Sequence, residues 1–164
     1  MMNYMQASKM KLFIAACSFL ALLSCSSNDK ELPYSNNADP IADYSYALST
    51  AKTNNKLVML IFGANWCPDC VELDRQLKAS PLKELINENY ELVKVNVGNF
   101  DENLDFIKNF GQPLAKGIPS IVITDADKTI SFISTAGELS SIRKMHKDDA
   151  QALFKKITTA VRSH

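Results

Sequence analysis

Residues 57–70 read LVMLIFGANWCPDC, and the organisation of the whole chain can be worked out from this segment. Its first part, Leu57 to Phe62, is a continuous apolar run, which is typical of a strand buried on both faces of a sheet. Pro68 suits the first turn of a helix, where its missing N–H group is not needed, and predicts a helix from Pro68 to Leu77. The two cysteines of the segment therefore lie where a buried strand passes into a helix.

The segments on either side extend this alternation of strands and helices. On the N-terminal side, Asp39 followed by Pro40 is a typical helix start and predicts a helix over 41–53. On the C-terminal side, a short helix is expected over 81–86, and residues 91–97 alternate between apolar and polar as a strand does.

The loop after that second strand contains a helix-start signal. Asn99 and Glu102 have the spacing of a capping box, in which two side chains close the first turn of a helix. A helix that begins there would turn Leu104, Ile107 and Phe110 towards the core.

The C-terminal part of the chain predicts a hairpin and a final helix. Residues 120–124 have the composition of a strand, 125–128 form a turn signal, and 129–134 return as the partner strand. Apolar residues of the final helix follow one face of a 3.6-residue period, namely Ala150, Leu153, Phe154, Ile157 and Val161. Strands that alternate with helices predict parallel units, with the hairpin as an antiparallel edge. The expected fold class is α/β, a three-layer α/β/α sandwich with a central mixed sheet and a C-terminal hairpin plus helix.

Cys67 and Cys70 are the strongest candidates for chemistry in the chain. Cys67 falls near the N-cap of the predicted helix, where unpaired N–H groups and the helix dipole favour a negative charge. A thiolate forms there more readily than at the ordinary thiol pKa of about 8.5, and the thiolate is the nucleophile in disulfide exchange. Cys70 lies one helical turn further on, so it is able to attack a mixed disulfide at Cys67 and release the substrate. Pro68, between them, stiffens the loop.

Two other interpretations of the cysteine pair remain, a zinc site and a static disulfide. One C-x-x-C motif supplies two zinc ligands, whereas a structural zinc site needs about four. His146 and His164 lie 76 and 94 residues beyond Cys70, without ligand spacing. A static disulfide is the second alternative, although a strand–helix junction beside a tryptophan is a poor place for one. We therefore expect no metal and no cofactor other than the redox-active disulfide.

Two motifs make the chain resemble the thioredoxin-like family. Residues 62–70, FGANWCPDC, are similar to the thioredoxin active site, with Trp66 directly before the first cysteine. Residues 117–120, GIPS, are similar to the cis-proline loop of that family and lead into a strand. The resemblance covers roughly residues 41–162 and includes envelope domains such as the C-terminal domain of the bacterial thiol-disulfide interchange reductase. It implies the thioredoxin fold and a protein-disulfide oxidoreductase.

The resemblance implies a role for each matching residue. Cys67 would be the nucleophile and Cys70 the resolving thiol, with protein thiols and disulfides as substrates. Trp66 would shape the contact surface. Pro119 would be cis and face the disulfide, and Ile118 would offer backbone to an extended substrate segment. Without the resemblance, Pro119 would simply be a proline at a strand entry.

Three further positions bear on the chemistry of the pair. Lys94 matches a lysine that thioredoxins place beneath the active site, but it also fits a solvated strand position. Thioredoxins carry a buried aspartate five residues before the tryptophan, and Ile61 stands there in this chain. Lys94 would then lack its usual partner, and Cys70 its usual proton acceptor. Asp69 replaces a neutral residue; it suits the helix dipole, but its negative charge opposes a thiolate at Cys67.

The N-terminus has the features of a lipoprotein leader. Lys9 and Lys11 precede an apolar run over 12–23, which has the length of a signal-peptide core and is too short to span a bilayer. Residues 22–25, LLSC, resemble the bacterial lipobox, whose cysteine is lipidated after cleavage. Cys25 is therefore the expected lipidation site. The alternative is ordinary secretion, with this cysteine as a free thiol.

These features divide the chain into three parts. We expect a lipoprotein signal peptide over 1–24, a lipidated cysteine and flexible tether over 25–40, and a thioredoxin-like domain over 41–164. An alternative for the tether is a short ordered strand around 32–34. The expected location is the bacterial cell envelope, as a lipid-anchored membrane protein facing the periplasm or the exterior.

Charge and motifs together predict the function. Lys plus Arg and Asp plus Glu number 18 each, so no nucleic-acid surface is expected. We expect disulfide exchange with envelope proteins through the Cys67–Cys70 redox pair, in the reducing or electron-carrier direction, because neither Pro68 nor Asp69 is a cation that would stabilise a thiolate. A reductant in an oxidising envelope needs electrons, so a membrane reductase is the expected donor. The alternatives are a binding module that uses the cis-proline groove without turnover, a disulfide-forming oxidant, and a copper-handling protein, which would carry a wider-spaced cysteine motif and a histidine.

Overall fold

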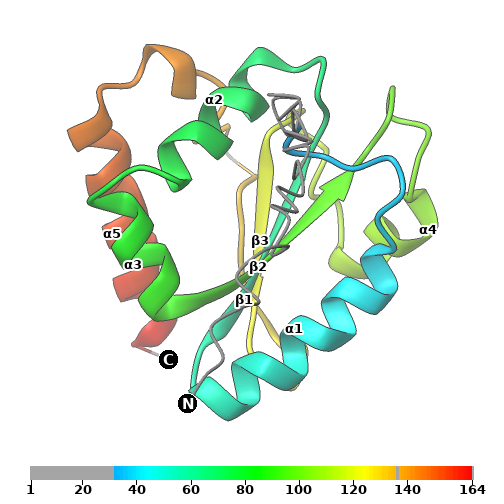
Figure 1. The fold of residues 1–164 in the computed structure, drawn as a ribbon, viewed down its shortest axis with the longest axis horizontal. Coiled ribbons are helices and arrows are strands. Elements are labelled where there is room, and N and C mark those ends of the chain that lie inside the picture. Colours follow the sequence, from blue (N-terminus) through cyan, green and yellow to red (C-terminus); the bar gives the residue numbers. More distant parts are fainter. Residues whose placement is uncertain (1–31, 136, 164) are drawn as a thin grey trace, which may run out of the picture. The chain divides into compact units, whose positions relative to one another are not determined.

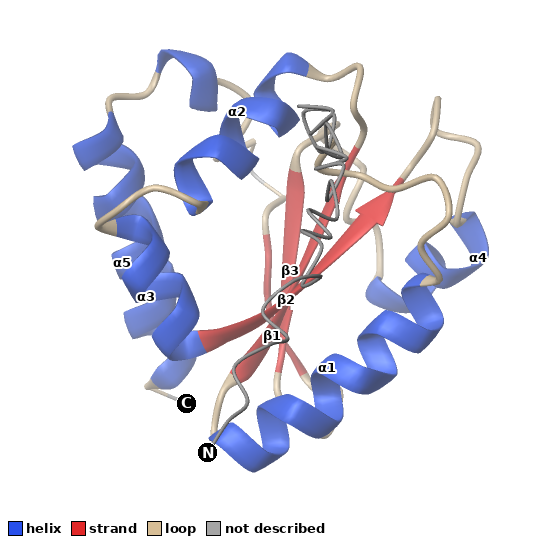
Figure 2. Cartoon of the chain, viewed as in Figure 1, coloured by secondary structure: helices blue, strands red, loops and turns tan. Residues whose placement is uncertain are grey.

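The computed structural model describes residues 32–135 and 137–163, which form a four-stranded sheet between two layers of helices (Figures 1 and 2). In chain order the elements are α1 (Pro40–Asn54), β1 (Leu57–Gly63), α2 (Pro68–Leu77), α3 (Leu82–Asn89), β2 (Tyr90–Asn96), α4 (Leu104–Ile107), η1 (Lys108–Phe110), β3 (Ser120–Thr124), β4 (Ile130–Ile133), η2 (Ile142–Lys144) and α5 (Lys147–Arg162). The predicted three-layer α/β/α sandwich is confirmed. The expected leader, Cys25 and the start of the tether lie outside the described residues.

The sheet has the strand order β2-β1-β3-β4 and is mixed. β1 and β2 are parallel, whereas β3 is antiparallel to both β1 and β4. The expected hairpin and final helix are present, but the prediction of parallel units is wrong for β3. A four-residue α4 rises by only about 6 Å, so it does not carry the chain back along the length of the sheet. The chain therefore enters β3 from the end at which it left β2.

β1 supplies side chains to both faces of the sheet. Val58, Leu60 and Phe62 pack into the core beneath α1, α4 and η1, whereas Met59 and Ile61 pack into the core beneath α2, α3 and α5. Figure 2 shows these two helical layers on opposite sides of the strands. The alternation follows from the two-residue period of a strand, and it explains why a doubly buried strand reads as one continuous apolar run.

The helix expected from the capping-box signal starts later than predicted. Asp101 Oδ1 accepts a hydrogen bond from the Asn99 backbone N–H at 2.8 Å, which closes a turn where the first helical turn was expected. α4 begins only at Leu104, after Asn103, which has a left-handed φ of 56° and makes no side-chain cap. Of the three side chains expected to face the core, the last two are buried and Leu104 is exposed.

The folded part of the chain begins earlier than residue 41. Residues 32–39 form no strand, but Tyr34 within them is buried, with 2% of its surface exposed. Asp39 then accepts hydrogen bonds from two backbone N–H groups in the first turn of α1, at 3.0 and 3.1 Å. The second half of the expected tether is therefore packed against the domain.

Sheet register brings the two sequence motifs together. Phe62, near the end of β1, pairs with Ser120, the first residue of β3. The chain continues from β1 to Cys67 and reaches β3 through Pro119. Because β1 and β3 are antiparallel neighbours, the two loops meet at the same end of the sheet, above the N-terminus of α2.

Candidate active site

Cys67 and Cys70 form a disulfide at the N-terminus of α2, with their Cα atoms 5.3 Å apart. Cys67 is the N-cap of the helix, and its Sγ accepts a hydrogen bond from the backbone N–H of Cys70 at 3.2 Å. Pro68 occupies the first helical position. In the reduced protein the same N–H group and the positive end of the helix dipole would favour a thiolate at Cys67.

The loop that precedes β3 lies against the outer sulfur. The carbonyl oxygen of Ile118 is 3.7 Å from Cys67 Sγ, and the Ile118–Pro119 peptide bond is cis. Cys67 is 5% exposed at this edge, whereas Cys70 is completely buried. An approaching disulfide therefore reaches Cys67 first, beside a backbone carbonyl that an extended peptide is able to use.

Two exposed aromatic rings stand next to this edge. Trp66 is 54% exposed, and its indole Nε1–H donates to the carbonyl oxygen of Gly98 at 2.7 Å. Phe100, 44% exposed, lies edge-on to it with the ring centroids 5.9 Å apart. Sequence reasoning found Trp66 through its place beside the cysteines but missed Phe100, which follows β2 in a loop and belongs to no periodic pattern.

Asp69 faces a cation. Its carboxylate accepts a hydrogen bond from the Arg143 backbone N–H at 3.1 Å and also forms an ion pair with the Arg143 side chain at 3.1 Å. Arg143 belongs to η2, which packs against α2. The negative charge of Asp69 beside Cys67 is therefore paired with a cation from a distant part of the sequence, which the sequence analysis did not identify.

Lys94 also has a partner that the sequence analysis did not identify. Its ammonium group forms an ion pair and hydrogen bond with Asp74 of α2, and Lys78 pairs with the other oxygen of that carboxylate at 2.9 Å. Burial disfavours the charged form of Asp74, but the hydrogen bonds from the two lysines outweigh it and hold its pKa below the ordinary value. Asp74 thus replaces the carboxylate that is missing at Ile61, which pairs with Lys94 in the sheet register. The spacing of four residues between Cys70 and Asp74 was the available signal, because residues four apart share a helix face.

Sequence reasoning also missed the place of Tyr34 at this site. Its side chain forms a small cluster with Cys67 and Cys70, and Ile118 packs against the same cluster. Its backbone is fixed by Asn65, which accepts from the Tyr34 N–H at 3.0 Å and donates to the Tyr34 carbonyl at 2.6 Å. No pattern near residue 34 predicts this contact, because it joins a polar N-terminal segment to the loop after β1.

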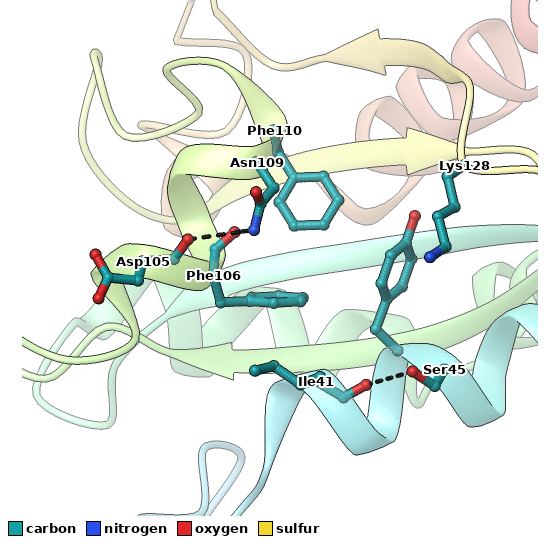
Figure 3. Close-up of a pocket in the computed structure, with 8 residues that line it drawn as sticks. Ile41, Ser45, Asp105, Phe106, Asn109, Phe110 and Lys128 are labelled. Carbon is teal, nitrogen blue, oxygen red and sulfur yellow. Dashed lines mark hydrogen bonds between the residues drawn. The ribbon is translucent and has the colours of Figure 1, made fainter.

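A separate cavity of about 500 Å³ lies between α1, η1 and the turn before β4 (Figure 3). Phe106 and Phe110 line it from one side, Ile41 and Ser45 of α1 from the other, and Lys128 reaches it from the turn. It shares no residue with the cysteine site. Within 32–135 and 137–163, no group of His, Cys, Asp or Glu is arranged to hold a metal ion, and no helix is long and apolar enough to cross a membrane.

Comparison with known proteins agrees with this geometry. The thioredoxin-like family matches residues 39–126, more than half of the chain. A disulphide isomerase from Xylella fastidiosa Temecula1 is 39% identical with a TM-score of 0.76, and the match covers 78% of this chain and 98% of that one. The reduced C-terminal domain of DsbD from Neisseria meningitidis, 19% identical with a TM-score of 0.53 over 73% of this chain and 96% of its own, shares the fold. No curated protein sequence matches the chain.

The family match, the identity to a solved isomerase and the cysteine pair at a strand–helix junction all lead to one assignment. The chain belongs to the thioredoxin-like family and is a protein-disulfide oxidoreductase with the Cys67–Cys70 pair as its redox centre.

Proposed function

We propose that the chain reduces disulfides in proteins of the bacterial cell envelope, or carries electrons to them, through the Cys67–Cys70 pair. The observation that carries this proposal is the unequal placement of the two sulfurs. Cys67 caps α2 at the edge that holds Trp66 and Ile118, whereas Cys70 is fully buried. This arrangement supports Cys67 as the attacking group and Cys70 as the resolving group.

The reaction follows from these two roles. The Cys67 thiolate attacks one sulfur of the substrate disulfide, the substrate S–S bond breaks, and the other substrate sulfur leaves as a thiolate that takes up a proton. Cys70 then loses its proton and attacks Cys67 Sγ, which breaks the mixed disulfide and releases the second substrate thiol. Two electrons have passed to the substrate, and the pair is left as a disulfide. A two-electron donor must restore the dithiol.

Asp74 is the group we assign to the proton of Cys70. The two residues lie one turn apart on the same face of α2, and Lys94 and Lys78 keep the Asp74 carboxylate ionised. An ionised carboxylate one helical turn from Cys70 on the same helix face is able to accept its proton when Cys70 attacks. Lys94 acts on Cys70 through Asp74 and is a positioning residue.

The charges around Cys67 support the reducing direction. A strong disulfide-forming protein stabilises its thiolate to a pKa of about 3.5 and has a potential of about −120 mV. In this chain Arg143 is engaged by Asp69 and Lys94 by Asp74, so neither cation is available to Cys67 alone. The helix N-terminus contributes typically about 0.3–1 kcal/mol. We expect a potential nearer to that of thioredoxin, about −270 mV.

Equilibration with a series of reduced and oxidised glutathione tests this direction, using the full chain purified in detergent. We expect a reduction potential of about −270 mV for the pair. A potential more positive than about −150 mV would make the chain a disulfide-forming protein. Failure to exchange with glutathione at all, and to speed insulin reduction by dithiothreitol, would support a binding module without turnover.

The location is part of the same proposal. The lipobox-like residues 22–25 support lipidation at Cys25, which would hold the domain at the envelope membrane, where a membrane reductase would supply electrons. Metabolic labelling with a fatty acid should mark the wild type and leave Cys25→Ser unlabelled. A wild type that is released unlabelled and soluble would contradict the anchor.

Disulfide isomerisation is a second candidate, because the similar Xylella protein is described as a disulphide isomerase. Isomerisation starts with the same attack by Cys67 but returns the electrons within one substrate, so it does not consume the dithiol. Reactivation of scrambled ribonuclease by the reduced chain, without a donor and without loss of its thiols, would favour this function over net reduction.

A further inference from the structure

Tyr34 reaches the redox centre from outside the regular elements of the fold. It lies before α1, is 2% exposed, and packs against Cys67 and Cys70. Residues 32–39 form no helix or strand, so its burial does not follow from a hydrophobic face of either. A large aromatic ring in direct contact with both cysteines is in a position to alter their chemistry.

The structure holds this ring in a built slot. A Cβ atom on Gly63 would collide with the hydroxyl oxygen and Cζ of Tyr34, so the glycine leaves the space that the ring fills. Asn65 holds the Tyr34 backbone with two hydrogen bonds, at 3.0 and 2.6 Å. Asn96 Nδ2 donates to Asn36 Oδ1 at 2.9 Å and fastens the same segment to the end of β2. The segment is thus fixed at separate points on the sheet and on the active-site loop.

The electrostatic surroundings keep the phenol neutral. Burial raises the pKa of the Tyr34 hydroxyl, and the negative charge of Asp74 raises it further. Tyr34 is therefore an uncharged group that contacts the sulfurs and is close enough to Asp74 to feel its charge. We call the side of the cysteine pair that this buried ring covers its inner side. A ring packed there excludes water, and water is what would otherwise solvate a thiolate.

We propose that Tyr34 is a positioning residue of the redox centre: its ring seals the inner side of the cysteine pair against water, disfavours the thiolate of the reduced state, and so makes the pair a better reductant. The proposal rests on the proposed disulfide exchange, because it concerns the dithiol–disulfide equilibrium of that same pair. In that equilibrium the disulfide gains two electrons and, where Cys67 is ionised, one proton, to give the Cys67 thiolate and the Cys70 thiol. A less stabilised thiolate shifts the balance towards the disulfide.

Tyr34→Ala in the full chain is the first test. Equilibration with glutathione should show the reduced form favoured by about tenfold over wild type, which corresponds to about 30 mV for a two-electron couple. The rate of Cys67 alkylation by iodoacetamide should reach its midpoint at lower pH. Tyr34→Phe, which keeps the ring, should stay close to wild type in both measurements. Tyr46→Ala is the matched control, because that tyrosine of α1 is 75% exposed.

Gly63→Ala tests the slot without touching the tyrosine. Its methyl group should displace the ring, so the variant should show the same shift as Tyr34→Ala, and the double variant should shift no further. Asn65→Ala removes both backbone hydrogen bonds and should shift the equilibrium in the same direction by a smaller factor. If Gly63→Ala does not fold, Asn65→Ala takes its place as the test.

The outcomes separate this proposal from the proposed function. If wild type exchanges with glutathione and Tyr34→Ala melts at a lower temperature with an unchanged equilibrium and alkylation profile, the tyrosine is merely structural and the inference is overturned. A shift in the Phe variant equal to that in the Ala variant would also overturn it, because the hydroxyl and not the ring would be responsible. If wild type does not exchange at all, the proposed function itself has failed.

Discussion

The outer and inner sides of the cysteine pair are formed by different kinds of groups. The outer side consists of Cys67, the exposed rings of Trp66 and Phe100, and the Ile118 carbonyl, all from loops or a helix end. The inner side consists of Cys70, buried at the start of α2, with an ion pair and a neutral phenol around it. The outer side offers surface to a substrate, whereas the inner side sets how strongly the pair holds electrons and protons. Changes on the two sides should therefore alter different measured quantities.

Removing each sulfur in turn should give the largest effects and the clearest contrast. Cys67→Ser should abolish dithiothreitol-driven insulin reduction, because the attacking sulfur is gone. Cys70→Ser should lose turnover as well but accumulate a mixed disulfide with substrate, since attack survives and resolution does not. Non-reducing gels with mass spectrometry report the trapped species. Full activity in both variants would refute the assignment of the pair, and trapping at Cys70 in Cys67→Ser would reverse the two roles.

Asp74→Asn should give the next largest effect, on the inner side. Resolution of the mixed disulfide should slow by about tenfold or more, because Cys70 loses its proton acceptor. Leaving the partly buried Lys94 unpaired should also lower the free energy of unfolding by about 1–2 kcal/mol. Stopped-flow release of substrate thiol and urea unfolding measure the two effects. Asp105→Asn is the matched control, because that carboxylate on α4 also pairs with a lysine but is exposed.

The stability effect of Asp74 has a defined pH dependence. Its folded pKa lies below the ordinary value, so its contribution to stability is present above the unfolded pKa of about 3.9 and is lost as pH falls through the folded pKa. The stability difference between wild type and Asp74→Asn should therefore be constant from neutral pH down to about pH 5 and shrink below it. A difference that grows on acidification would contradict the ion pair with the lysines.

Trp66→Ala should give a moderate effect, confined to the outer side. Loss of an exposed ring that a substrate contacts should raise KM for a protein disulfide by about fivefold, or about 1 kcal/mol of binding. Phe100→Ala should act in the same direction, because the ring supports the indole edge-on. The glutathione equilibrium should remain at the wild-type value in both variants. A shifted glutathione equilibrium with an unchanged KM would mean that these rings affect the redox equilibrium of the pair and not substrate binding.

The two sides also differ in how far the sequence predicts them. Cys67, Trp66, Ile118 and Pro119 belong to two short motifs that the sequence identifies. The antiparallel pairing of β1 with β3, which the strand patterns did not predict, brings the two loops to one end of the sheet. The cis Ile118–Pro119 bond agrees with what the resemblance implied. Local patterns identify these residues, because each belongs to a motif at a strand end or a helix start, whereas the direction of β3 decides that the two motifs meet.

The inner side depends on contacts between distant segments. Lys94 was expected to lack a partner, because Ile61 stands where thioredoxins carry an aspartate. Its partner is Asp74 of α2, which a strand pattern does not indicate. Tyr34 was assigned to a flexible tether, because a polar segment with prolines shows no apolar period; a slot left by Gly63 determines its place instead. Ion pairs between elements, and the space that a glycine leaves for a distant side chain, depend on the tertiary structure. Sequence periodicity does not predict them.

The Arg143–Asp69 pair should give the smallest effect and the finest test of the comparison. It lies at the first turn of α2, next to Cys67, with the arginine about half exposed and the carboxylate largely covered. Arg143→Ala leaves Asp69 as an unbalanced anion near the attacking sulfur, so the thiolate becomes less favourable and the reduced form less stable. We expect a shift of about two- to threefold towards the disulfide in the glutathione equilibrium, since solvent screens an exposed pair. This shift is opposite in sign to that expected for Tyr34→Ala.

In an Asp69→Asn background the anion is absent, so adding Arg143→Ala should change the equilibrium no further. A shift that persists there would mean that the arginine acts on Cys67 directly, and no shift in the single variant would mean that the charge of Asp69 does not reach the sulfur.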